Sequence, residues 1–185
     1  QNIGIPSLVL MERAALSVVD VMLKEIQKTD HILILCGTGN NGGDGIAVGR
    51  ILHHLGFLVD ILIVGNKDKG TQEFKTQLEI SKNIEMNIFN QQAENEYNII
   101  VDAIFGIGLS KDVTGIYKEL IEWVNASNSK VYSIDIPSGI QASTGKIMNV
   151  AIRADETITF GFHKLGNILY PGAEYAGKVT LKDIG

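Results

Sequence analysis

Two spacings of apolar residues divide the chain into segments. Over residues 7–27, apolar side chains recur every three or four positions, which predicts a helix with one face turned to the core. Pro6 and Ser7, just before this pattern, are typical of a helix start. The predicted core-facing stripe consists of Leu8, Met11, Ala15, Val18, Val19, Met22 and Ile26.

Beyond this helix, short unbroken apolar runs alternate with further helical patterns. Unbroken runs of Val, Ile and Leu are typical of strands buried on both faces, and intervening helices are typical of crossover connections. We predict strands over residues 31–37, 58–65, 86–90, 98–106, 130–138, 156–161 and 178–183, and helices over 43–54, 71–83 and 115–127. The expected fold is α/β, a mostly parallel sheet covered on both sides, as a single domain over residues 1–185.

Three polar, glycine-bearing loops follow predicted strands, over residues 37–45, 106–112 and 138–139. Ligands of open parallel sheets bind outside the carboxyl ends of the strands, so we expect these loops to converge on one site. The first loop also opens a helix, whose backbone amides and positive dipole end attract negative charge. The sequence therefore favours an anionic ligand at this edge of the sheet.

The first loop carries a recognisable glycine pattern. Gly37, Gly39 and Gly42 match the G-x-G-x-x-G fingerprint of dinucleotide-binding proteins, which makes an NAD-dependent dehydrogenase one interpretation. Such enzymes also place an acidic residue at the end of the second strand to bind the ribose. Here that strand ends in "IVGNK" and Asp60 lies at its start, so the fingerprint is half met. A glycine-rich turn capped by Asn and Asp is the purely structural alternative.

Carboxylates close two of the predicted strands. Asp102 and Asp135 end apolar runs, where a carboxylate is costly unless it finds a cation or hydrogen-bond donors; capping of the next loop is the alternative role for Asp102. Asn41, Asp102 and Ser138 offer oxygen atoms only, which suits a hard cation rather than zinc. Two carboxylates in one cleft also allow acid/base chemistry. His163, after the sixth predicted strand, is a further candidate for ligand contact.

Composition narrows the classes of partner. A net charge of -5 and a pI near 5.3 argue against a broad nucleic-acid surface. The apolar runs are far shorter than the roughly 20 residues of a membrane-spanning helix. Cys36 is the single cysteine, and no secretory signal pattern precedes the first helix, so we expect a cytoplasmic protein without an internal disulfide.

Four ordered motifs carry a family resemblance. The segments "GTGNNGGDGIAVGRIL", "VDAIFGIGLSKDVTGIY", "SIDIPSGIQASTG" and "ADETITFGFHKLG" resemble the NAD(P)H-hydrate epimerase family, the YjeF amino-terminal domain. The resemblance implies a Rossmann-like, three-layer α/β/α sandwich that forms a homodimer. It also implies interconversion of the R and S epimers of hydrated NADH and NADPH (NADHX and NADPHX), which carry water at C6 of the nicotinamide ring. A fused or separate NAD(P)H-hydrate dehydratase would then act on the S epimer.

The resemblance also implies roles for individual residues. It places Asn41, Asp102 and Ser138 at a potassium ion and Asp135 beside the reacting ring, where we expect it to transfer the proton, because epimerisation needs a group that takes and gives one. The preference between NADHX and NADPHX stays open. A non-catalytic YjeF-type binding or dimerisation module is the rival, although a scaffold has no chemical reason to keep these four polar residues. The implied substrate-binding residues are Asn40, Asn41, Gly42, Gly43, Asp44, Gly106, Ile107, Gly108, Leu109, Ser110, Lys111, Asp112, Tyr117 and Asp135.

Overall fold

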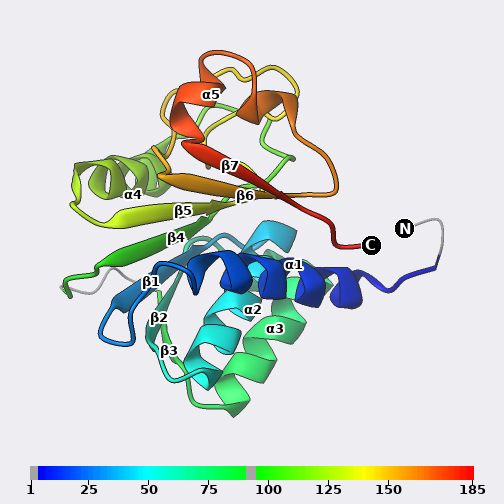
Figure 1. The fold of residues 1–185 in the computed structure, drawn as a ribbon, viewed down its shortest axis with the longest axis vertical. Helices are drawn as coiled ribbons and strands as arrows, with labels where there is room; N and C mark the ends of the chain where they lie inside the picture. The colour runs from blue at the N-terminus through cyan, green and yellow to red at the C-terminus, as the bar shows by residue number, and fades with distance from the viewer. Residues whose placement is uncertain (1–3, 91–94) are drawn as a thin grey trace.

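A computed structural model describes residues 4–90 and 95–185, and its centre is one parallel sheet. Seven strands lie in the order β3-β2-β1-β4-β5-β6-β7, each parallel to its neighbours (Figure 1), which confirms the predicted α/β class. The strands are β1 (His31–Cys36), β2 (Leu58–Ile63), β3 (Asn87–Phe89), β4 (Ile99–Ala103), β5 (Lys130–Ile134), β6 (Glu156–Phe160) and β7 (Lys178–Lys182). The helices are α1 (Ser7–Met22), α2 (Asn40–His54), α3 (Gln72–Asn83), α4 (Gly115–Ala126) and α5 (Gly172–Tyr175), with 3-10 turns η1 (Lys67–Lys69) and η2 (Leu165–Asn167).

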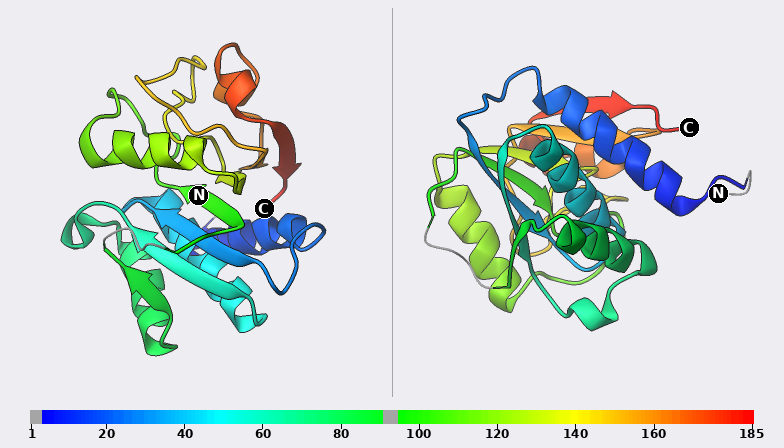
Figure 2. Two further views of the ribbon diagram at one scale, coloured as in Figure 1. Left: turned by 90° about the vertical axis from the view of Figure 1, so that its left-hand side faces the viewer. Right: turned by 90° about the horizontal axis from the view of Figure 1, so that it is seen from below.

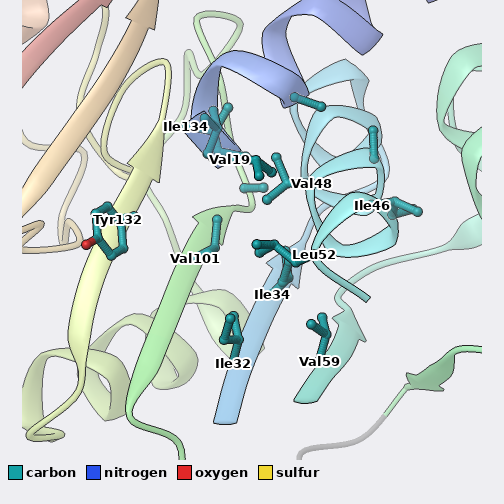
Figure 3. Packing of buried hydrophobic residues seen from close by; sticks show 14 of the residues in the cluster. Val19, Ile32, Ile34, Ile46, Val48, Leu52, Val59, Val101, Tyr132 and Ile134 are labelled. Atoms are coloured by element: carbon teal, nitrogen blue, oxygen red, sulfur yellow. The ribbon is translucent and has the colours of Figure 1, made fainter. Parts of the chain in front are cut away.

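Helices cover both faces of the sheet, as predicted. Helices α1, α2 and α3 lie on one face and α4 on the other (Figure 1, Figure 2). Because side chains alternate along a strand, Ile34 of β1 packs into the cluster under α1 and α2, whereas Leu35 joins the cluster under α4. Figure 3 shows Leu52 of α2 next to Ile34, and Val48 of the same helix next to Val19 of α1. Two large apolar clusters, one on each face, thus pack against the sheet.

Several predicted boundaries are wrong by a few residues. Helix α2 begins at Asn40 instead of residue 43, because Gly39 takes an extended backbone and its carbonyl accepts the first helical hydrogen bond from Gly43. Helix α1 ends at Met22, and Ile26 is buried beyond its end. Leu8 was expected in the core-facing stripe and is exposed instead. The run over 130–138 ends as a strand at Ile134, where the backbone turns.

The strand order places four loops along one edge of the sheet. The loops after β1, β4, β5 and β6 leave from the carboxyl ends of neighbouring strands. The connection after β1 leads to α2 on one face, and the connection after β4 leads to α4 on the other. Loops that diverge in this way leave a crevice between them, and this crevice holds ligands in open α/β sheets.

Candidate active site

A cavity of about 690 Å³ opens in this crevice. Its size falls within the range of small-molecule and cofactor sites, about 300–1,000 Å³. Of the predicted substrate-binding residues, those that line it are Asn40, Asn41, Asp44, Gly106, Ile107, Gly108, Leu109, Ser110, Lys111, Tyr117 and Asp135. Gly37, Thr38, Gly39, Thr71, Ile104 and Phe105 complete the wall. The structure therefore brings together residues from the ends of β1, β4 and β5.

Three predicted substrate-binding residues lie outside this wall. Gly42 is buried behind it, and a Cβ atom there would lie 1.8 Å from the Gly37 carbonyl oxygen. A Cβ at Gly43 would lie 2.7 Å from Cε of Met11. These two glycines let the first turn of α2 approach the loop and α1 closely, which aims Asn40 and Asn41 at the cavity. Asp112 is exposed beyond the lining.

Asn41, Asp102 and Ser138 meet beside the carbonyl group of Phe105. Nδ2 of Asn41 donates to that carbonyl oxygen at 2.9 Å, and Oγ of Ser138 lies 3.4 Å from it. The Ser138 hydroxyl donates to Oδ1 of Asp102 at 2.5 Å and accepts from the Phe105 amide at 2.8 Å. The three residues predicted to share one cation thus form one connected cluster.

Asp102 is a fully buried carboxylate without a cationic side-chain partner in the described residues. Burial raises its pKa, while hydrogen bonds from Ser138, Ser133 and the Ile104 amide oppose the rise. Residues 4–90 and 95–185 contain no cluster of three or more His, Cys, Asp and Glu side chains that could hold a metal ion. A cation at this cluster would therefore rest on one carboxylate together with hydroxyl, amide and carbonyl oxygens.

Asp135 is held from several directions at the end of β5. Its backbone has a φ of 69°, a left-handed conformation that Asp tolerates better than most residues. Its carbonyl accepts from Nδ2 of Asn167 at 2.9 Å. Its Oδ1 accepts from the Thr159 hydroxyl at 3.1 Å and lies 2.5 Å from Nζ of Lys164. Its Oδ2 has no hydrogen-bond partner among the described residues, so one carboxylate oxygen is anchored and the other is left for a ligand.

Asp44 adds a second carboxyl group to the cavity wall. Removal from water and the negative charge of Asp135 raise the pKa of Asp44 well above its ordinary value. Asp135, by contrast, is ion-paired with an ammonium group. Two carboxyl groups in such different surroundings can act as a proton donor and a proton acceptor on one ligand.

Sequence reasoning missed Lys164, although it singled out the neighbouring His163. His163 is exposed, whereas the Lys164 side chain is 10% exposed and reaches Asp135. The sequence showed only that Lys164 follows a predicted strand. The pairing of that strand with the strand of Asp135, which brings the two side chains to one edge, is a feature of the tertiary structure. The described helices include none that is long and apolar enough to cross a membrane.

Known proteins are similar to this chain over nearly its whole length. A family model described as "YjeF-related protein N-terminus" matches residues 7–166. An NAD(P)H-hydrate epimerase of Weissella koreensis is 45% identical over 185 residues, which cover 100% of this chain and 84% of the relative. An NAD(P)H-hydrate epimerase of Limosilactobacillus fermentum is 43% identical over 183 residues, 98% of this chain and 88% of the relative. The crystal structure of yeast ynu0 has the same fold, with a TM-score of 0.82 over 98% of this chain and 80% of the yeast chain at 22% identity.

The matched region includes every loop of the candidate site. It runs from the first residue of α1 into η2, so it contains the glycine loop, the cluster around Asp102, and both Asp135 and Lys164. The relatives extend the likeness over nearly the whole chain. This chain therefore belongs to the family of YjeF-related proteins defined by their N-terminal domain.

Proposed function

We propose that this protein is an NAD(P)H-hydrate epimerase, an isomerase that interconverts the R and S forms of NADHX and NADPHX. The observation that carries the proposal is the pair of carboxyl groups, Asp135 and Asp44, on the wall of a cavity built at the glycine loop. Relatives named for this activity are 43–45% identical over nearly the whole chain. The fold by itself would not give an activity, because similar folds serve many functions.

The loops that line the cavity suit a dinucleotide. The first turn of α2 starts at Asn40, and its free backbone amides and dipole favour phosphate oxygens. Lys111 adds a positive charge from the opposite loop. Asp135 lies on the same wall, so a hydrated nicotinamide bound next to it would place C6 within reach of the free carboxylate oxygen.

The chemistry needs proton transfers and no oxidant or reductant. In one route, an acid protonates the C6 hydroxyl, water leaves, and a planar iminium carbon forms. Water then adds to the opposite face, and a base takes its proton. Asp44 is suited to donate and Asp135 to accept, and the roles exchange in the reverse direction. A positioned proton-transfer group contributes about 10² to 10⁴ in rate. Ring opening and closure is the other route and needs the same two groups.

A potassium ion fits the oxygen cluster beside this wall. Asp102, Ser138 and Asn41 would hold it together with backbone carbonyls, because a buried carboxylate surrounded by neutral oxygens matches a weakly polarising, hard cation. The ion would supply positive charge that balances Asp102 and fixes the loop around Phe105. The residues that move protons are Asp44 and Asp135.

We further propose that the protein acts as a homodimer through the outer side of α1. Val9, Leu16 and Leu23 are 47%, 54% and 45% exposed and recur every seven residues, so they form one apolar stripe on the outer side of α1 and the residue that follows it. A second copy of this chain would cover the stripe. The cytoplasmic location and the fused or separate dehydratase stay predictions from the sequence.

Separated NADHX epimers test the activity directly. Each epimer is incubated with the protein and the mixture is followed by chromatography. We expect both reactions to reach the same R/S mixture, with no change in the oxidation state of the nicotinamide. A scaffold protein would leave each epimer unchanged beyond its spontaneous rate. A dehydrogenase would instead reduce or oxidise an intact cofactor, and either result would overturn the proposal.

A further inference from the structure

Lys164 reaches the candidate site from the loop after β6. Its Nζ lies 2.5 Å from Oδ1 of Asp135 and donates to the Phe160 carbonyl oxygen at 2.8 Å. The two charged side chains are 10% and 16% exposed. Lysine is rarely this buried in proteins unless it is paired, because an ammonium group loses its hydration. Among the described residues, Asp135 is the anionic partner of Lys164.

The segment around Lys164 also fixes the backbone of Asp135. Asn167 is 3% exposed, and its Nδ2 donates to the Asp135 carbonyl while its Oδ1 is buried without a hydrogen-bond partner. A buried amide oxygen without a partner costs free energy. The hydrogen bond from Nδ2 of Asn167 to Asp135 is the contact that explains why an Asn is buried at this position. Thr159 adds a hydrogen bond to Oδ1. Residues 159–167 therefore hold both the main chain and one carboxylate oxygen of Asp135.

We propose that Lys164 is a positioning residue of the epimerase, which anchors Oδ1 of Asp135 and leaves Oδ2 free to exchange a proton with the substrate. This inference rests on the proposed function. The amino group of Lys164 fixes the direction of the carboxylate through its contact with Oδ1. Because an error of about 1 Å in the position of a catalytic group can lower a rate about 10²-fold, loss of the anchor affects turnover more than binding.

Substitution of Lys164 separates positioning from folding. We expect Lys164→Ala to lower kcat about 10²-fold with KM changed by less than about threefold. Ethylammonium added to the assay should restore part of kcat in Lys164→Ala and leave the wild type unchanged. Lys24→Ala is the matched control, because Lys24 belongs to an exposed surface ion pair with Asp20 at 3.9 Å. In an Asp135→Asn background, Lys164→Ala should lower kcat no further, since the group that it positions is gone.

The outcomes distinguish this inference from the proposed function. Wild-type protein without epimerase activity overturns the function. If the wild type is active and Lys164→Ala has an unchanged kcat, the inference alone is overturned. The same holds if Lys24→Ala lowers kcat as much as Lys164→Ala does. Urea unfolding of the two single variants and the double variant gives a readout without turnover. Residues in contact change the unfolding midpoint non-additively, so additive midpoints would refute the pairing of Lys164 with Asp135.

Discussion

Replacement of Gly42 by Ala tests whether this glycine is needed for close backbone packing rather than for direct contact with the ligand. A Cβ at Gly42 would lie 1.8 Å from the Gly37 carbonyl oxygen, whereas real Cβ contacts are essentially never below 3.0 Å. The backbone of α2 or of the glycine loop must therefore move by about 1.2 Å, the difference between these distances. Neither partner is a flexible side chain that could turn away. The shift would displace Asn40 and Asn41, which line the cavity.

The size of the effect follows from two opposing contributions. Overpacking costs about 1–3 kcal/mol, and the upper end applies because the collision is between backbones. Alanine is better than glycine inside a helix by about 1 kcal/mol, which offsets part of the loss. We expect a net loss of about 2 kcal/mol, which for a chain of this size lowers Tm by about 4–8 °C. The displaced loop should also lower kcat/KM about 10²-fold.

Thermal unfolding and epimerase assays measure these changes, and Gly39→Ala is the matched control for stability. A Cβ at Gly39 meets nothing within 4 Å, so Gly39→Ala should lower Tm much less than Gly42→Ala although both glycines lie in the same loop. A Gly42→Ala protein that melts with the wild type and turns over normally would refute the packing argument. If Gly42→Ala has a normal Tm but no longer binds the dinucleotide, Gly42 contacts the ligand directly.

Four further predictions concern the carboxylates and α1. Asp135→Asn should keep the fold, because Asn tolerates its left-handed backbone, and lose at least about 10²-fold in kcat; activity above a tenth of wild type would remove Asp135 from its role. Asp102→Asn should lower activity, and high KCl should partly restore it while NaCl at the same concentration should not. Equal restoration by the two salts would count against a potassium site. Burial and the charge of Asp135 raise the pKa of Asp44 in the folded state above its ordinary value. The folded protein therefore keeps a proton that the unfolded chain releases, and stability falls as the pH rises above the ordinary pKa of Asp. Asp44→Asn should therefore gain Tm over the wild type above about pH 4 and lose that gain below it, and a gain independent of pH would contradict the shift. Leu16→Glu should convert the dimer to a monomer in light scattering, while Lys24→Glu should not, and a wild-type monomer would refute the homodimer.

The boundaries of α2 and β5 show how far local pattern reaches. Apolar runs predicted the seven strands, most clearly β1, β2 and β4, because buried strands of a parallel sheet carry near-continuous Val, Ile and Leu. The start of α2 at Asn40 depends on the extended backbone of Gly39, which no apolar period reports. The end of β5 depends on the left-handed backbone of Asp135, which Asn167 holds from a distant loop.

The sequence by itself determined the fold class, the edge of the sheet that carries the site, and the residue types gathered there. These follow from short unbroken apolar runs, from the helical period of 3.6 residues and from the rule that parallel strands end at one edge. Tertiary structure decided which of those residues face the cavity. Gly42 and Asp112 lie outside its wall, and Lys164 is brought to Asp135 because β6 pairs with β5, a contact between segments distant in sequence. Side-chain burial and charge pairing depend on such neighbours, so no local pattern could assign them.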